Sequence, residues 1–143
     1  MTQLIENTLY QKIREVIPTV CVDLLVTNNQ GNYLLAKRLE EPAKGEWYFP
    51  GGRIFKWETW KDTALRKGHE ELGVKLDIGE LISAENFFDV DHSYHTLNLI
   101  VHAKFICGII KLDKSHEEYK WMDSIPDNLH PCVKNPLLKF GFK

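Results

Sequence analysis

The chain has 143 residues, of which 43% are hydrophobic and 27% charged, proportions typical of one globular domain with a substantial core. Its formal net charge of -2 excludes a surface built as a whole for nucleic acid or for an anionic membrane. The three cysteines form no CxxC pair, and the sequence offers no secretory signal or membrane span. We therefore expect a cytoplasmic protein that binds neither nucleic acid nor membrane.

The first half of the chain predicts one helix and a hairpin. Apolar residues at near-helical spacing predict an amphipathic helix from Leu4 to Val16, which ends before Pro18. Two β-rich segments, Val20–Thr27 and Tyr33–Lys37, flank a turn-rich stretch and predict a pair of adjacent strands. A polar loop follows at residues 40–46.

The second half predicts a helix, several strands and a short closing helix. The helix runs from about Thr59 to Leu72, and Gly73 ends it because glycine adopts the left-handed C-cap conformation cheaply. The later elements are expected at Val74–Leu81, Asn86–Val90, Thr96–Cys107 and Tyr119–Met122 (strands), and at Leu137–Phe140 (helix). Without repeats or linkers, this mixture predicts a single α+β domain over residues 1–143, with helices packed on a mixed sheet.

The segment from Gly52 to Val74 carries the chemistry. On a helix, Arg66 and Glu70 share a face, and Glu70 and Glu71 present two carboxylates near the helix end. Magnesium prefers oxygen ligands and commonly takes one or two carboxylates together with substrate phosphate oxygens. The glycines that precede the helix let the backbone approach a ligand closely. A Glu-Glu pair alone would also fit a surface helix with salt bridges.

The whole pattern resembles the Nudix box, which reads Gly, five residues, Glu, seven residues, Arg-Glu-apolar-any-Glu-Glu-any-Gly-apolar. The matching positions are Gly52, Glu58, Arg66, Glu70, Glu71, Gly73 and Val74. The resemblance implies a Nudix fold, in which a mixed β-sheet lies between α-helices as an α/β/α sandwich. It also implies a divalent cation, Mg²⁺ with Mn²⁺ as a substitute.

Two positions depart from the box. Lys67 stands where the box has a glutamate, and Gly68 stands where it has an apolar residue. In many Nudix pyrophosphatases that glutamate is thought to activate the water that attacks phosphorus. A protonated lysine can neither ligate a metal nor accept that proton, so the base must come from elsewhere or the chain is inactive.

The GDP-mannose mannosyl hydrolases break the box at the same place, and this chain is similar to them beyond it. The similar segments lie within residues 18–131 and are Val22–Leu24, Leu34–Arg38, Pro42–Trp47, Pro50–Arg53, His116–Trp121 and Asn128–His130. The resemblance implies that water attacks the anomeric carbon of a nucleotide sugar, giving GDP and free mannose. It also implies a homodimer.

Residue roles follow from this resemblance. The implied metal ligands are Glu71 first, Glu70 second, and the carbonyl of Gly51 or Gly52. The implied catalytic and substrate-binding groups are Arg38 and Arg53 on the diphosphate, Asp23 and His130 near the sugar, and Arg66. Arg66 either contacts phosphate or orients Glu70, and His130 is the predicted general base, a role worth typically about 10²–10⁴-fold.

Other interpretations stay open. An ordinary Nudix pyrophosphatase would cleave at phosphorus and would need Glu70, Glu117 or Glu118 as its base. A non-catalytic nucleotide-binding module would result if Lys67 had removed catalysis. Taken alone, His130 fits a solvated residue in a polar tail, and Asp23 fits a structural carboxylate with a partner.

Overall fold

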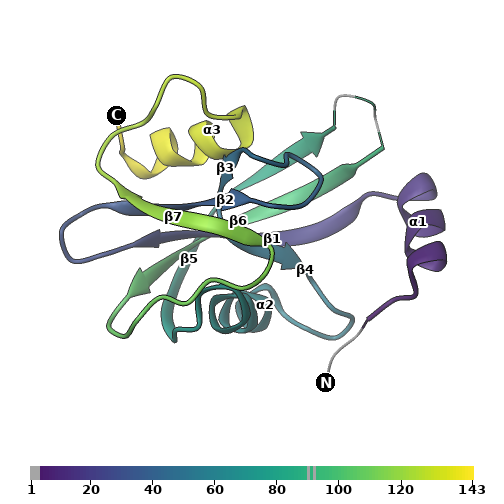
Figure 1. The fold of residues 1–143 in the computed structure, drawn as a ribbon, viewed down its shortest axis with the longest axis horizontal. Coiled ribbons are helices and arrows are strands. Elements are labelled where there is room, and N and C mark those ends of the chain that lie inside the picture. Colours follow the sequence, from purple (N-terminus) through teal and green to yellow (C-terminus); the bar gives the residue numbers. More distant parts are fainter. Residues whose placement is uncertain (1–3, 90, 92) are drawn as a thin grey trace.

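The computed structural model describes residues 4–89, 91 and 93–143 of the chain. One mixed sheet forms its centre, with strands in the order β3-β2-β1-β6-β5, while β4 pairs with β1 and β7 with β2 (Figure 1). Strand β1 runs parallel to β6, and the other pairs are antiparallel. The strands are β1 (Thr19–Thr27), β2 (Tyr33–Arg38), β3 (Trp47–Tyr48), β4 (Gly51–Arg53), β5 (Leu76–Phe88), β6 (His95–Phe105) and β7 (His116–Met122).

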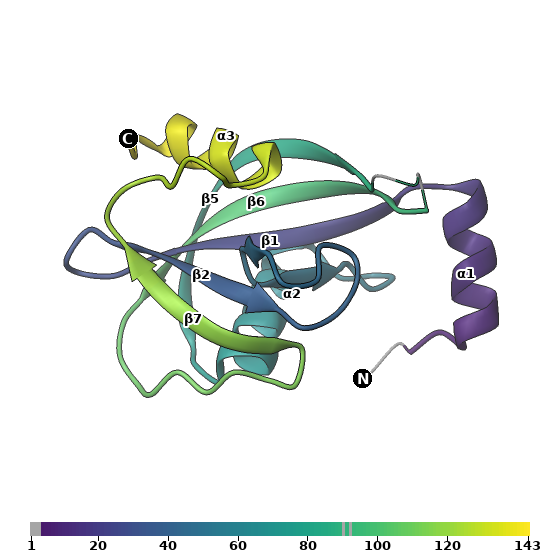
Figure 2. The same ribbon diagram turned by 45° about the horizontal axis from the view of Figure 1, so that its top comes forward.

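Helices cover both faces of the sheet, so the predicted three-layer α+β architecture is confirmed (Figure 2). The helices are α1 (Asn7–Val16), α2 (Trp60–Lys67), the π-helical turn η1 (Gly68–Leu72) and α3 (Pro131–Phe140). Successive side chains of a strand point to opposite faces of the sheet, so β1 contributes side chains to two hydrophobic cores. Val22 and Leu24 pack with Ala64 of α2, whereas Leu25 packs with Val133 of α3.

Most predicted elements are present with shifted ends. Strands predicted at 74–81 and 86–90 form one strand, β5, whose pairing with β6 is irregular between Ile78 and Ser83. Val90, the last residue of that prediction, lies outside the described residues. Helix α3 begins well before the predicted Leu137, because Pro131 is tolerated in the first turn, where an amide hydrogen has no helical partner.

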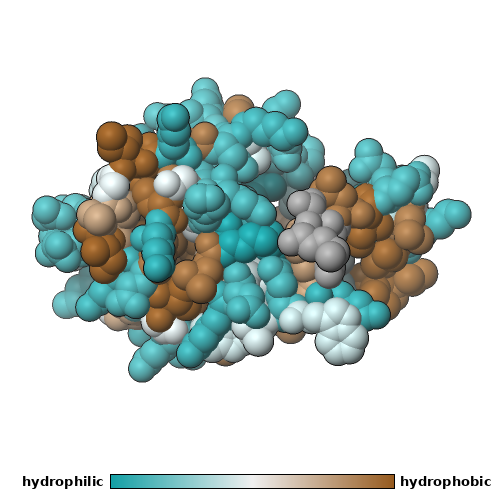
Figure 3. Space-filling view, turned by 90° about the horizontal axis from the view of Figure 1, so that it is seen from below, coloured by the Kyte–Doolittle hydropathy of each residue, from teal (hydrophilic) through white to brown (hydrophobic). Residues whose placement is uncertain are grey.

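Helix α1 lies at one end of the molecule, away from both layers (Figures 1 and 2). It has no buried residue, and the side chains of Leu4, Leu9 and Val16 near or on it are exposed. Apolar side chains gather at this end in the hydropathy view (Figure 3). Among the described residues, no helix combines the length and the apolar character that a membrane span needs.

Candidate active site

A cleft of about 600 Å³ opens beside β1, within the 300–1,000 Å³ range that is typical of ligand pockets. Its lining comes from β1, from the glycine pair, from the end of the Nudix-like helix and from the segment before β7. The side chains and backbone most relevant to chemistry are Asp23, Arg38, Gly51, Gly52, Arg53, Lys67, Glu71 and Asp113. The structure thus brings together all the predicted site residues except Glu70, Arg66 and His130, which lie outside this lining.

Both glycines lie in close contact with neighbouring groups. Gly51 pairs with Asp23 between β4 and β1, and a Cβ atom there would lie 2.4 Å from Asp23 Oδ1. A Cβ atom on Gly52 would lie 2.6 Å from Lys67 Cε. The Gly51 amide donates a hydrogen bond of 2.7 Å to Glu71 Oε2, which fixes that carboxylate at the strand.

Arg66 acts as a clamp on the loop that leads into α2. Its Nε and Nη2 atoms donate to the two carboxylate oxygens of Glu58, both at 2.8 Å, and Nη2 also donates to the Arg53 carbonyl at 2.9 Å. These hydrogen bonds lower the pKa of Glu58 to about 2. With Nη1 3.2 Å from Glu70 Oε2, Arg66 is engaged in orienting carboxylates, the second of its two predicted roles.

The predicted second helix consists of a regular part and a π turn. Thr59 and Asp62 form a reciprocal capping box that starts α2, and Gly73 at φ 67° ends η1. A Cβ atom on Gly68 would lie 2.8 Å from Leu76 Cδ1, which explains why no apolar side chain stands there. Single π turns occur frequently at functional sites. This one leaves Glu71 5% exposed and the side chain of Glu70 46% exposed.

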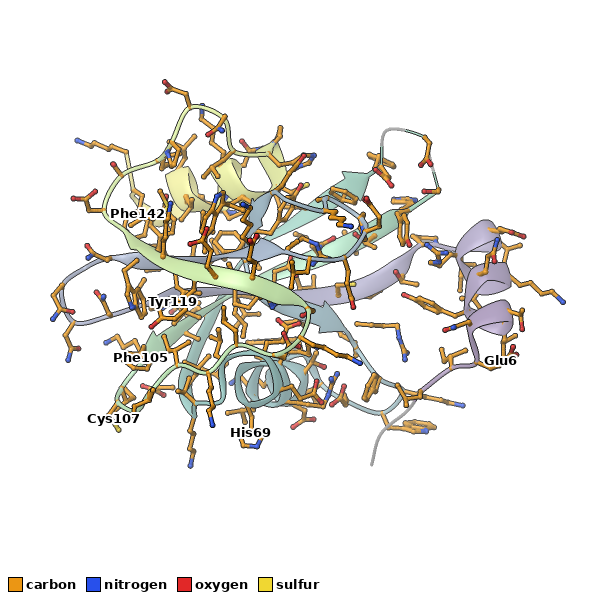
Figure 4. The ribbon with its side chains drawn as sticks, viewed as in Figure 1. Glu6, His69, Phe105, Cys107, Tyr119 and Phe142 are labelled. Atoms are coloured by element: carbon orange, nitrogen blue, oxygen red, sulfur yellow. The ribbon has the colours of Figure 1, made fainter. Side chains whose placement is uncertain are left out.

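Lys67 occupies the space between the two glutamates. Its Nζ atom lies 3.3 Å from Glu70 Oε2 and 3.3 Å from Glu71 Oε1. His69, from the same segment, points away from the body of the molecule (Figure 4). The helix therefore contributes one buried carboxylate to the cleft, already in contact with a lysine.

A second group of donors, which the sequence did not predict, lies near Glu71. One donor atom each from Glu71, Asp113 and His116 lie within 4.8 Å of one another. His116 Nδ1 is 3.1 Å from Asp113 Oδ1, and the buried Nε2 atom has no hydrogen-bond partner among the residues that the structure describes. The only sequence signal was the position of His116 in one of the segments similar to the mannosyl hydrolases.

The environment of Asp23 is polar but poorly hydrated. Asn98 Nδ2 donates a 2.7 Å hydrogen bond to Asp23 Oδ2. Burial nevertheless raises the pKa of Asp23 to about 6, and the Asn98 hydrogen bond and the charge of Arg38 only partly oppose this shift. Arg38 is held by a 2.7 Å hydrogen bond from Nε to the Pro42 carbonyl. Such a carboxyl can exchange protons near neutral pH.

His130 has a structural contact in addition to its predicted role. Its Nδ1 accepts a 3.1 Å hydrogen bond from the Cys132 amide and so caps α3. The ring packs beside Tyr48 and Phe87, which line the cleft, at centroid distances of 5.7 and 5.2 Å. Burial lowers the pKa of His130, so the neutral form prevails at neutral pH.

Comparisons with known proteins agree on one family. The NUDIX domain family matches residues 17–125. The low-salt glycan biosynthesis protein Agl8 of Haloferax volcanii is 35% identical over 127 residues, which are 85% of this chain and 81% of that protein. The ADP-ribose pyrophosphatase of Methanocaldococcus jannaschii is 27% identical over 74% of this chain and 62% of its own length.

A solved structure supports the same fold. The MutT NUDIX hydrolase from Burkholderia pseudomallei matches 86% of this chain and 98% of its own, with a TM-score of 0.77 and 25% identity. The expected Nudix fold is therefore confirmed. Nudix hydrolases generally use a divalent metal, and the carboxylates at Glu71 and Asp113 beside an unpartnered imidazole nitrogen fit such an ion.

Proposed function

The chain belongs to the Nudix family, and from this premise we propose that it hydrolyses GDP-mannose, or a related nucleoside diphosphate sugar, to GDP and free sugar. In this reaction water attacks the anomeric carbon instead of phosphorus. The observation that carries the proposal is Lys67. It stands where the box has the carboxylate that would activate water at phosphorus, and its ammonium group contacts Glu70 and Glu71.

The competing bases for attack on phosphorus are poorly placed. Glu70 is held by Arg66 and Lys67, at 3.2 and 3.3 Å. Glu117 lies 3.4 Å from Lys37 on the exposed surface of β7, and Glu118 is exposed as well. A general base must reach the proton it removes, so these contacts disfavour the pyrophosphatase alternative.

The charge pattern of the cleft supports a substrate with a diphosphate. Arg38 and Arg53 line it, and guanidinium groups bind phosphate oxygens in a bidentate manner. The names of two relatives point to the same substrate class, since one refers to glycan biosynthesis and the other to ADP-ribose. We therefore infer a nucleotide sugar, with mannose and guanine as the specific prediction.

The proposed reaction balances without a proton on the leaving group. Oxygen of water forms a bond to the anomeric carbon, the bond from that carbon to the diphosphate oxygen breaks, and its electron pair leaves with GDP. The proton of water passes to a base. A bound Mg²⁺ or Mn²⁺ would supply charge neutralisation for the departing diphosphate.

Two histidines compete for the role of base. His130 is the residue predicted from the sequence, but its Nδ1 caps α3 and its ring packs against two aromatic residues. His116 has Nδ1 beside Asp113 and keeps Nε2 unpaired among the described residues. Its side chain is 1% exposed and it is not among the residues that line the cleft, so the attacking water must reach this buried nitrogen from the Asp113 end of the cleft. We place the base at His116, with His130 as the competing assignment.

The residues proposed to hold the cation are Glu71 and Asp113, with the predicted carbonyl of Gly51 or Gly52. Glu70, the predicted second ligand, contacts Arg66 and Lys67 instead. Glu71 is nearly buried, and desolvation raises its pKa while the charge of Lys67 lowers it. A divalent cation would favour the charged carboxylate and so oppose this desolvation.

Product analysis tests the proposal directly. The protein is incubated with GDP-mannose and Mg²⁺ in water enriched in oxygen-18, and the products are resolved by mass spectrometry. We expect GDP without the label and mannose with it. Labelled GMP or mannose phosphate would instead establish the pyrophosphatase reaction, and no turnover over a panel of nucleotide sugars would favour the binding module.

The proposed homodimer has a candidate surface. Helix α1 exposes Leu9 and Val16, which a second copy of the chain could cover. Sedimentation of the protein with and without a Val16→Glu substitution measures this, and a wild-type monomer would contradict it. The cytoplasmic location, and the absence of nucleic-acid and membrane partners, stay expectations from composition.

A further inference from the structure

The side chain of Lys67 packs into the site instead of extending into solvent. Its side chain is only 15% exposed, although a lysine on a helix surface normally keeps its charged end in water. Its Cε atom lies close to Gly52, where an added Cβ atom would be 2.6 Å away and the flexible end of the lysine would have to shift.

The ammonium group of Lys67 lies between two carboxylates. It lies 3.3 Å from an oxygen of each neighbouring glutamate, and Glu71 is 5% exposed. Arg66 adds another positive charge 3.2 Å from Glu70. A divalent ion placed between these glutamates would meet fixed positive charges at short range and would be repelled by them.

The other donors near Glu71 come from the loop before β7 and from the start of β7 itself. There the neighbours are Asp113 and His116, whose donor atoms lie within 4.8 Å of the Glu71 oxygen and of one another. We propose that Lys67 is a tethered cation that occupies one of two cation positions around Glu71, so that the chain holds a single divalent ion on the Asp113 side. This inference rests on the proposed function for the assignment of the cation to Glu71 and Asp113, and it does not depend on which substrate is hydrolysed.

A substitution series on the whole protein tests the inference without substrate. Mn²⁺ binding is measured by titration, with free Mn²⁺ followed by electron paramagnetic resonance. The variants are Lys67→Met, which removes the charge, and Lys67→Glu, which restores the carboxylate of the box. Lys61→Glu, an exposed position on α2 whose Nζ lies 5.4 Å from the Trp60 ring centre, is the matched control for the charge change.

We expect one Mn²⁺ per wild-type chain and two per Lys67→Glu chain. Lys67→Met should keep one ion and bind it at least about tenfold more tightly, because a unit charge close to the ion is lost. Lys61→Glu should match the wild type. Two ions on the wild type, or unchanged stoichiometry in Lys67→Glu, would overturn the inference.

The outcomes stay separate from those of the product analysis. If Lys67→Glu fails to fold, the affinity of Lys67→Met still decides, and an unchanged affinity would count against a tethered cation. A chain that binds one Mn²⁺ in the expected way but releases labelled GMP would refute the proposed function and leave this inference intact.

Discussion

The polar groups that α2 and β7 bring near Glu71 differ in whether they have partners. On the α2 side Glu58 is paired with Arg66, and Glu70 with both Arg66 and Lys67. On the β7 side, His116 keeps a buried ring nitrogen without a partner among the described residues. Buried polar groups are nearly always hydrogen-bonded, and an exception calls for an explanation. The paired side maintains geometry, and we infer that the unpaired side carries out the chemistry.

Substitution of His116 should have the largest effect and would break this comparison if it did not. In His116→Gln the proton acceptor is lost, so we expect kcat to fall by roughly 10²–10⁴-fold, with a smaller change in KM. Steady-state kinetics at one fixed pH and saturating Mg²⁺ measure kcat and KM of both proteins.

The control is His130→Gln, at the position predicted from the sequence. It removes the cap of α3 and should cost about 1 kcal/mol of stability, with a modest effect on kcat. If His130→Gln instead lost the large factor while His116→Gln did not, the base would be His130. Recovery of His116→Gln activity in excess Mn²⁺ would indicate a metal ligand at His116 and contradict its role as base.

Asp23 extends the comparison, because its buried carboxyl group lowers the stability of the folded protein when it is ionised. Burial raises its pKa from 3.8 to about 6, so the folded chain binds the proton more tightly than the unfolded chain. The stabilising contribution of the protonated group is therefore complete below about pH 4 and is lost as the pH rises through about 6. Asp23→Asn should raise the free energy of unfolding at about pH 8 by roughly 2–3 kcal/mol and reduce activity.

Urea unfolding of the metal-free protein at about pH 4.5 and about pH 8 measures this difference. The gain in Asp23→Asn should be small at the lower pH and large at the higher one. Asp77→Asn, which makes the same charge change at an exposed position of β5, should show no such growth. An Asp23→Asn variant that is less stable than the wild type at the higher pH would show that the carboxylate is satisfied by its hydrogen bond from Asn98.

The contact between Arg66 and Glu70 on the paired side follows from the sequence. Fixed spacing along one helix determines which side chains share a face, so the order of residues alone was enough to place Arg66, Glu70 and Glu71. The glycine pair could be placed too, because tight approach of the backbone leaves a clear signature at Gly51 and Gly52. These are local features, and local patterns carry them.

The residues of the unpaired side could not be predicted, because contacts between segments far apart in the sequence bring them together. His116 reaches the site because β7 pairs with β2, where it lies opposite Arg38 after an irregularity in the register. Asp113 is fixed by the loop before β7. The π turn was missed for a related reason, since the fit of Gly68 against Leu76 of β5 is a tertiary contact.

Gly68→Ala should have the smallest effect. It tests whether the positions of Glu70 and Glu71 depend on the π turn η1. The added Cβ would lie 2.8 Å from Leu76 Cδ1, and Leu76 is 4% exposed, so the core must shift to accept it. Overpacking of this kind costs typically about 1–3 kcal/mol. Thermal unfolding should register that loss, whereas His69→Ala, at an exposed neighbour, should stay within about 0.5 kcal/mol of the wild type. If Gly68→Ala were as stable as the wild type and bound Mn²⁺ equally well, the turn would not be what sets Glu71 apart from Glu70.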